Sequence, residues 1–341
     1  NVLVDLSFLS NFAEMSSSMI LLNFMLYGGW LPFAFLFLWG AKELWLDYVS
    51  GQWMSQQKFT LLAIDVPRGN EISLKSVENL FTYFGGAHGS INFLDKYWVG
   101  KLQLSFSFEI VSIDGYSQFL IYTPVQFRNL VESAVYSVYP DAEITEVNDY
   151  TEGTPNSFPD DDYNLWGAEF IPVRPDAYPF KTYPEFIDQN SSAEMIFKDP
   201  LASLMDLNSS LRPGEQLWYQ ILVKPTDYSW TKNGEGEIGK IMKEKGPAKK
   251  ENPIMFIIGV FTTAFSEIVS IFGEALGLSG GASSESEDSQ EPLTMMNLKP
   301  REKKQVEAIQ AKMSKNGFEC KIRMVYLSKK EVMNVPKVVS G

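Results

Sequence analysis

The pattern in this sequence that comes nearest to known chemistry is GEGEIGK at residues 234–240, followed by Ile241. The spacing of Gly234, Gly239 and Lys240 matches the glycines and the lysine of a loop that binds nucleotide phosphates. The rest of the motif is missing, because Ile241 stands where a Ser or Thr would hold magnesium and the two glutamates would repel phosphate. We therefore interpret the stretch as a glycine-rich linker.

Other groupings that could support catalysis or metal binding are weak. His88 is the only histidine and Cys320 the only cysteine, so neither a histidine metal cluster nor a Cys–His nucleophile pair can be assembled, and no intrachain disulfide can form. The acidic triplet 160–162 lacks the alternating ligands and the turn glycine of a calcium loop. The sequence thus predicts no catalytic residue, no cofactor and no metal site, and we expect a protein that is not an enzyme.

The charges are unevenly distributed along the chain, whose net charge is −13. Residues 129–173 contain ten acids and no Lys or Arg, whereas residues 299–337 contain eleven Lys or Arg and four acids. The basic region could face anionic lipid, nucleic acid or an acidic protein partner, although a solvated helix surface is the more ordinary interpretation. The candidate contacts for an anionic partner are Arg301, Lys303, Lys304, Lys312 and Lys315.

A long uncharged run occupies residues 15–41, between Glu14 and Lys42. It exceeds the roughly 20 residues that cross a bilayer, so it predicts a transmembrane helix after an N-terminal flank of residues 1–14, with a buried globular helix as the less favoured alternative. Because Lys42 and Lys58 follow an acidic flank, the positive-inside rule predicts a single-pass protein of the cell membrane with the residues after 42 in the cytoplasm. The expected membrane-anchor residues are Trp30, Trp39, Trp45 and Lys42.

Residues 58–150, which follow a juxtamembrane segment at 42–57, show the pattern of a βαββαβ module. Residues 58–66 form a strand candidate, and a helix begins near Ser73. The alternating residues on either side of Asp114-Gly115 predict a hairpin with a tight type I′ turn. A helix that starts near Pro124 and a final strand at 142–147 complete the order of the ferredoxin-like split βαβ plan.

A second ferredoxin-like module is predicted at residues 165–331, after an acidic loop at 151–164 and before a tail at 332–341. An insertion at 225–298 interrupts it. The predicted fold class is therefore α+β, with an N-terminal transmembrane helix and two tandem ferredoxin-like modules.

The insertion combines an apolar amphipathic helix at 253–278 with a disordered acidic linker at 279–291. Glu267 and Glu274 divide the apolar segment, which favours a helix that lies in the membrane interface or packs on protein over one that spans the bilayer. The residues that would form its apolar face are Phe256, Ile257, Val260, Phe261, Phe265, Ile268 and Phe272.

Several motifs resemble a known family of bacterial proteins. They are FEIVS (108–112), RNLVE (128–132) and YPDAE (139–143), preceded by FGGAHGS (84–90) and YWVGK (97–101) and followed by YLSKKE (326–331). Together they resemble the membrane-anchored N-terminal region of conjugation-like, type IV secretion-related, HerA-like ATPases. This sequence departs from that family's pattern, because it contains no intact phosphate-binding loop.

Taken with this resemblance, the predicted anchor, the tandem modules and the missing catalytic groups favour a non-enzymatic, membrane-anchored docking component of a conjugation-like or type IV secretion-related translocation machine. Its expected partners are the lipid bilayer and other protein subunits, including a separate ATPase, and it could form a homo-oligomer. Two alternatives remain open: a nucleic-acid-binding accessory subunit that uses the basic region 299–337, and a membrane-tethered domain that senses a ligand.

Overall fold

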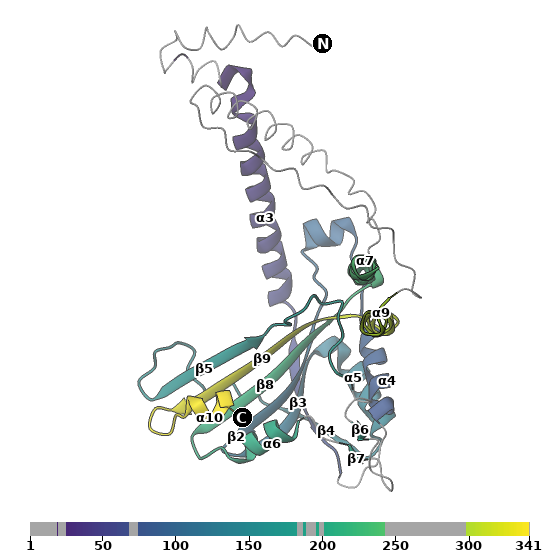
Figure 1. Cartoon of the computed structure of the whole chain (residues 1–341). Helices are drawn as coiled ribbons and strands as arrows, with labels where there is room; N and C mark the ends of the chain where they lie inside the picture. The colour runs from purple at the N-terminus through teal and green to yellow at the C-terminus, as the bar shows by residue number, and fades with distance from the viewer. Residues whose placement is uncertain are drawn as a thin grey trace, which may run out of the picture.

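The computed structural model describes residues 19, 25–67, 74–182, 187–188, 196–197, 201–242 and 298–340 (Figure 1). The chain is α+β, and its main feature is a seven-stranded antiparallel sheet. The strands of this sheet are β1 (Phe59–Asp65), β2 (Phe106–Ile113), β3 (Tyr116–Pro124), β4 (Glu143–Val147), β5 (Tyr163–Phe170), β8 (Glu215–Pro225) and β9 (Phe318–Lys329). A separate two-stranded ladder pairs β6 (Ile187–Asp188) with β7 (Ile196–Phe197).

The helices include both long elements and single turns. The α-helices are α3 (Leu31–Ser55), α4 (Leu74–Gly85), α5 (Arg128–Val138), α6 (Ala202–Ser209), α7 (Thr231–Ile241), α9 (Pro300–Met313) and α10 (Val335–Ser340). The short helices are η1 (Met25–Gly29), η2 (Asp95–Val99), η3 (Val125–Phe127) and η5 (Tyr228–Trp230).

The seven strands lie in the order β4-β1-β3-β2-β8-β9-β5. The first four have the split βαβ arrangement, and their β2–β3 hairpin turns at Asp114 (φ 54°) and Gly115 (φ 86°), as a type I′ turn requires. The prediction of two tandem modules is wrong in one respect. β2 pairs with β8 from Phe106 opposite Val223 to Ile113 opposite Gln216, so both halves of the chain share one sheet.

Helices α4 and α5 cover the first half of one sheet face. Phe84 of α4 packs edge-on against Phe106 and Phe108 of β2, with ring centroids 4.9 Å and 5.0 Å apart. Val131 and Val135 of α5 are fully or almost fully buried in the same core. The helical spacing of these apolar residues is what places them all on the sheet side of their helices.

The predicted transmembrane helix at 15–41 is wrong, and with it the predicted single-pass membrane localisation. The described helix in this region, α3, begins only at Leu31 and extends through Lys42, Glu43 and Asp47. Across the described part of the chain, no helix combines the length and apolar character needed to cross a membrane. The uncharged run is broken at Gly28, whose φ of 95° is not helical, and glycine and proline within such a run are signs of a helix boundary.

The C-terminal half of α3 is fastened to η2. The Trp45 indole Nε1 donates a hydrogen bond to the carbonyl oxygen of Tyr97 at 2.7 Å, and Val49 is buried at this contact. Gly100 ends η2 with φ 73°, and a Cβ there would lie 2.3 Å from the carbonyl carbon of Val49. Only glycine fits, because both the backbone conformation and the space exclude a side chain.

We expect Gly100→Ala to loosen α3 from η2, because the new Cβ would collide with the backbone at Val49. Amide hydrogen exchange in residues 42–55 should become at least tenfold faster. Gly51→Ala is the matched control, since Gly51 lies in α3 with open space around it and alanine there should stabilise the helix by about 0.5–1 kcal/mol. Equal exchange rates in the two variants would contradict this role of Gly100.

Candidate functional site

Helix α9 begins at Pro300, which suits the first helical position because it has no N–H to leave unpaired. The backbone N–H of Lys299 donates to the Glu302 carboxylate at 3.0 Å and caps the first turn. Val306 and Ile309 are completely buried on one side of the helix. The residues that face the other way share a stripe of helical spacing, and they are Arg301, Lys304, Gln305 and Ala308.

A loop at residues 174–179 lies against this stripe and is held by Lys312. The Lys312 ammonium donates to the backbone carbonyls of Asp176 and, at 3.4 Å, Tyr178. Burial lowers the pKa of Lys312, while the nearby Asp176 opposes that shift. The guanidinium of Arg174 lies over the Tyr178 ring, 5.6 Å from its centroid. Lys312 thus acts as a support for the loop.

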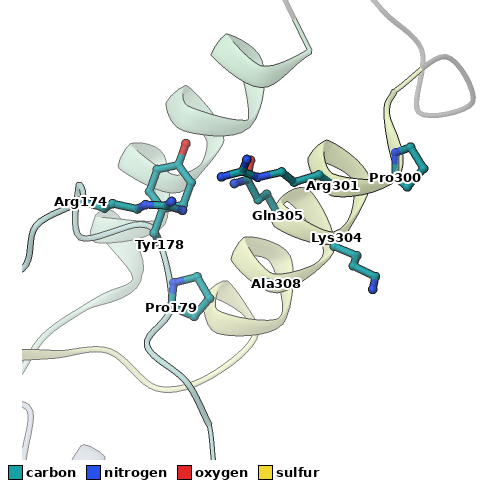
Figure 2. A pocket seen from close by; sticks show the side chains of 8 residues that line it. All are labelled: Arg174, Tyr178, Pro179, Pro300, Arg301, Lys304, Gln305 and Ala308. Atoms are coloured by element: carbon teal, nitrogen blue, oxygen red, sulfur yellow. The ribbon is translucent and has the colours of Figure 1, made fainter. Parts of the chain in front are cut away.

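The loop and the helix line an open hollow of about 510 Å³, which we call the basic pocket (Figure 2). Its lining residues are Arg174, Tyr178, Pro179, Pro300, Arg301, Lys304, Gln305 and Ala308. Figure 2 shows the side chains of Arg174 and Arg301 extending toward each other from the two walls, with Gln305 beside Arg301 and Lys304 directed away. The lining contains three cationic side chains and no acid.

This arrangement can bind an anion. Within the described residues, none of the three cations forms an ion pair with an Asp or Glu. Arginine presents a planar set of N–H donors that matches phosphate and carboxylate oxygens. The lining contains no Ser, Thr, Cys, His, Asp or Glu, and its plainest property is positive charge, so we describe it as a binding site.

The five cations predicted to contact an anionic partner occupy different environments. Arg301 and Lys304 line the basic pocket, and Lys303 is exposed on α9 outside its lining. Lys312 holds the loop, and Lys315 forms an ion pair with Glu78 of α4.

Sequence reasoning missed Arg174, Tyr178 and Gln305. One usable sign was present, because Arg174 is the first cation after the acidic stretch 129–173. Tyr178 and Gln305 could not be found in this way, because their place in the pocket lining depends on the conformation of the loop and on which side of α9 faces it.

The four predicted membrane-anchor residues lie on or next to helix α3. Trp30 and Trp39 are exposed, Trp45 is bonded to η2, and Lys42 pairs with Glu43 at 2.8 Å. The hydrogen bond that Lys42 donates to the Glu43 carboxylate raises the pKa of Lys42. The seven residues of the predicted interfacial helix, from Phe256 to Phe272, lie outside the described residues.

The phosphate-loop pattern at 234–240 lies within helix α7. Gly234 faces α9, where a Cβ would come within 2.5 Å of the Met313 sulfur, and Lys240 forms an ion pair with Glu237 at 2.6 Å. Gly234 therefore serves helix packing, and the stretch is helical instead of forming a phosphate-binding loop.

A row of polar side chains crosses the sheet face opposite α4 and α5, with Glu109 and Gln220 buried, Tyr150 half-buried and Arg323 exposed. Arg323 Nε donates to Gln220 at 2.6 Å, Gln220 donates to the Tyr150 hydroxyl at 2.6 Å, and Tyr150 donates to Glu109 at 2.5 Å. Burial, together with the charge of Glu109, strongly raises the pKa of Tyr150. The phenol therefore remains protonated, and the row serves to satisfy buried polar atoms.

A second buried network centres on Glu215, a completely buried carboxylate at the start of β8. It accepts hydrogen bonds from the Tyr326 hydroxyl at 2.5 Å, the Arg212 amide at 2.6 Å and the Lys337 ammonium at 3.2 Å. Burial by itself would raise the pKa of Glu215, but these donors favour the charged form and the net shift is downward. The network links β8, β9 and α10 through hydrogen bonds to one carboxylate.

Among the described residues, no cluster of three His, Cys, Asp or Glu is placed to hold a metal ion.

Residues 90–338 match the model of a protein family described as "Domain of unknown function (DUF8128)". The match covers well over half of the chain, so the chain belongs to this family. No curated protein and no solved structure matches it.

We expect Glu215→Gln to lower the free energy of unfolding by about 1–3 kcal/mol at neutral pH, the range for weakening buried hydrogen bonds to a charged group. Because folding lowers the pKa of Glu215, its carboxylate contributes fully above its ordinary pKa of 4.5 and loses this contribution as pH falls through the folded-state value. The difference between wild type and variant, measured by urea unfolding, should therefore shrink in acid.

Glu319→Gln is the control for this experiment. Its ion pair with Lys224 is largely exposed, so the change should cost at most about 1 kcal/mol. A loss as large as that of Glu215→Gln would contradict the special role of the buried carboxylate.

Proposed function

We propose that this member of the DUF8128 family is a non-enzymatic docking subunit of a multi-protein assembly, and that α3 inserts among its partner subunits. The observation that carries the proposal is the exposed apolar N-terminal half of α3. Figure 1 shows this helix extending away from the sheet. Its large exposed apolar side chains are Leu31, Phe33, Phe35, Leu36, Phe37, Leu38 and Trp39.

These side chains surround the helix. Successive residues of an α-helix are about 100° apart, so the unbroken series 35–39 covers every direction. A helix that is apolar all round is stable only when it is enclosed on more than one side, and exposed apolar patches of this kind mark interaction sites. A single flat partner surface would leave part of α3 in water, which favours an assembly of several subunits.

The attachment of α3 to the body of the protein suits a docking role. Trp45, Val49 and Gly100 fix the C-terminal half of the helix on η2. A partner that grips the apolar half would therefore be coupled to the sheet through a rigid element. Fixed elements position an interface with less loss of entropy than mobile ones.

The resemblance of residues 84–143 to conjugation-like, type IV secretion-related ATPases supports placing the assembly in a translocation machine. In this proposal, a separate subunit supplies ATP hydrolysis, because the phosphate-loop-like stretch of this sequence is part of helix α7, where Gly234 lies against Met313. The role of the present chain is to hold subunits together.

Site-specific photo-crosslinking in the native cell tests this role. A photoreactive amino acid at Phe37, which is 75% exposed on α3, should give discrete adducts with other proteins. The same group at Tyr116, which is 71% exposed beside the β2–β3 turn, provides the matched control and should give few adducts. Mass spectrometry of the adducts would identify the partner subunits.

The proposal would be overturned if Phe37 gave no protein adduct, or only adducts with lipid. It would also fail if Phe37 and Tyr116 gave the same set of adducts, since that result would reflect general surface encounter.

A further inference from the structure

We propose that the basic pocket between residues 174–179 and α9 binds a small organic phosphate, with the phosphate held by Arg174 and Arg301. This inference is independent of the docking role, because it rests on a different part of the molecule. The convergence of the two guanidinium groups on one cavity is shown in Figure 2.

The charge of the pocket selects an anion. Both guanidinium groups line one hollow that contains no acid, so the potential there is positive and favours an anion. Arg301 also lies in the first turn of α9, where the helix dipole adds positive potential. Phosphate suits this geometry better than a single carboxylate does, because its oxygens can accept from both arginines at once.

The size and the walls of the pocket select a small organic molecule. A cavity of about 510 Å³ lies within the range of roughly 300–1,000 Å³ that is typical of small-molecule sites. Tyr178, Pro179, Pro300 and Ala308 provide apolar wall, and Gln305 adds an amide that can both donate and accept. Bare inorganic phosphate would leave this wall uncovered, so an organic part should add affinity.

The surroundings disfavour a long nucleic acid as the ligand. A nucleic-acid strand needs a continuous track of cations along its backbone. Farther along the chain, Lys312 of α9 bonds the carbonyls of the loop, and Lys315, just after the helix, pairs with Glu78. The cations of the pocket therefore do not continue into such a track along the helix.

The loop is positioned before any ligand arrives. Lys312 fixes it by bonding the carbonyls of Asp176 and Tyr178, and Ala177 between them is buried. On the other wall, Val306 and Ile309 anchor α9 in the protein. A site formed by two fixed walls binds with a smaller loss of entropy than one that must assemble.

Isothermal titration calorimetry of the full chain at low salt tests the proposal with four probes: AMP, ribose 5-phosphate, inorganic phosphate and adenosine. We expect both organic phosphates to bind more tightly than inorganic phosphate and adenosine not to bind. Arg174→Gln and Arg301→Gln should each weaken the binding of the organic phosphates at least tenfold. Both side chains are exposed at the surface, and unchanged thermal melting would show that the variants fold.

Lys303→Gln is the matched control, because it removes the same charge from the same helix outside the pocket. Its affinity for AMP should stay within twofold of that of the wild type. Absence of binding by AMP and ribose 5-phosphate would overturn the proposal, as would an equal loss in Lys303→Gln. A single-stranded oligonucleotide that displaced AMP at a lower concentration than AMP itself binds would also overturn it, in favour of a nucleic-acid surface.

Discussion

The pairing of β2 with β8 is the contact on which the rest of the architecture depends. It joins a four-stranded unit to three further strands and makes one sheet from segments that are about a hundred residues apart in sequence. Both strands carry apolar side chains on the helix-covered face, where Phe106 and Val223 share one core. Because the sheet is continuous, α9 from the second half comes close enough to α4 from the first for Lys315 to meet Glu78.

Two polar networks accompany this broad sheet. Polar side chains that are buried on its strands need hydrogen-bond partners within the protein. The chain from Arg323 to Glu109 does this along one row of paired residues, and Tyr150 bridges it. Glu215 does the same at the end of β8, where it joins β9 to α10. Both networks connect neighbouring strands, and their hydrogen bonds and burial account for the shifted pKa values of Tyr150 and Glu215.

Local features could be predicted from the sequence, and features that depend on distant partners could not. Asp114-Gly115 specifies its own turn, because the required φ values are a property of two adjacent residues. The pairing of β2 with β8 could not be predicted. The alternation of apolar and polar residues in each strand indicates which face of the strand is buried, but it does not indicate which strand lies beside it. The uncharged run was also overinterpreted as a membrane span. Gly28 and Pro32 mark the boundary near which α3 begins, and the charged residues that follow are part of the same helix.

The candidate site shows the same division between local and distant information. The sequence identified a basic helix, but it could not separate cations that face solvent from those that serve the fold. Lys312 and Lys315 bond groups from other segments. Arg301 faces a loop more than a hundred residues earlier in the chain, from which Arg174 extends toward it. Arg174 and Arg301 are exposed and form no ion pair with an acid of the described residues, whereas Lys312 and Lys315 each bond a group from another segment. The two arginines are therefore cations of this region that an anionic ligand could reach.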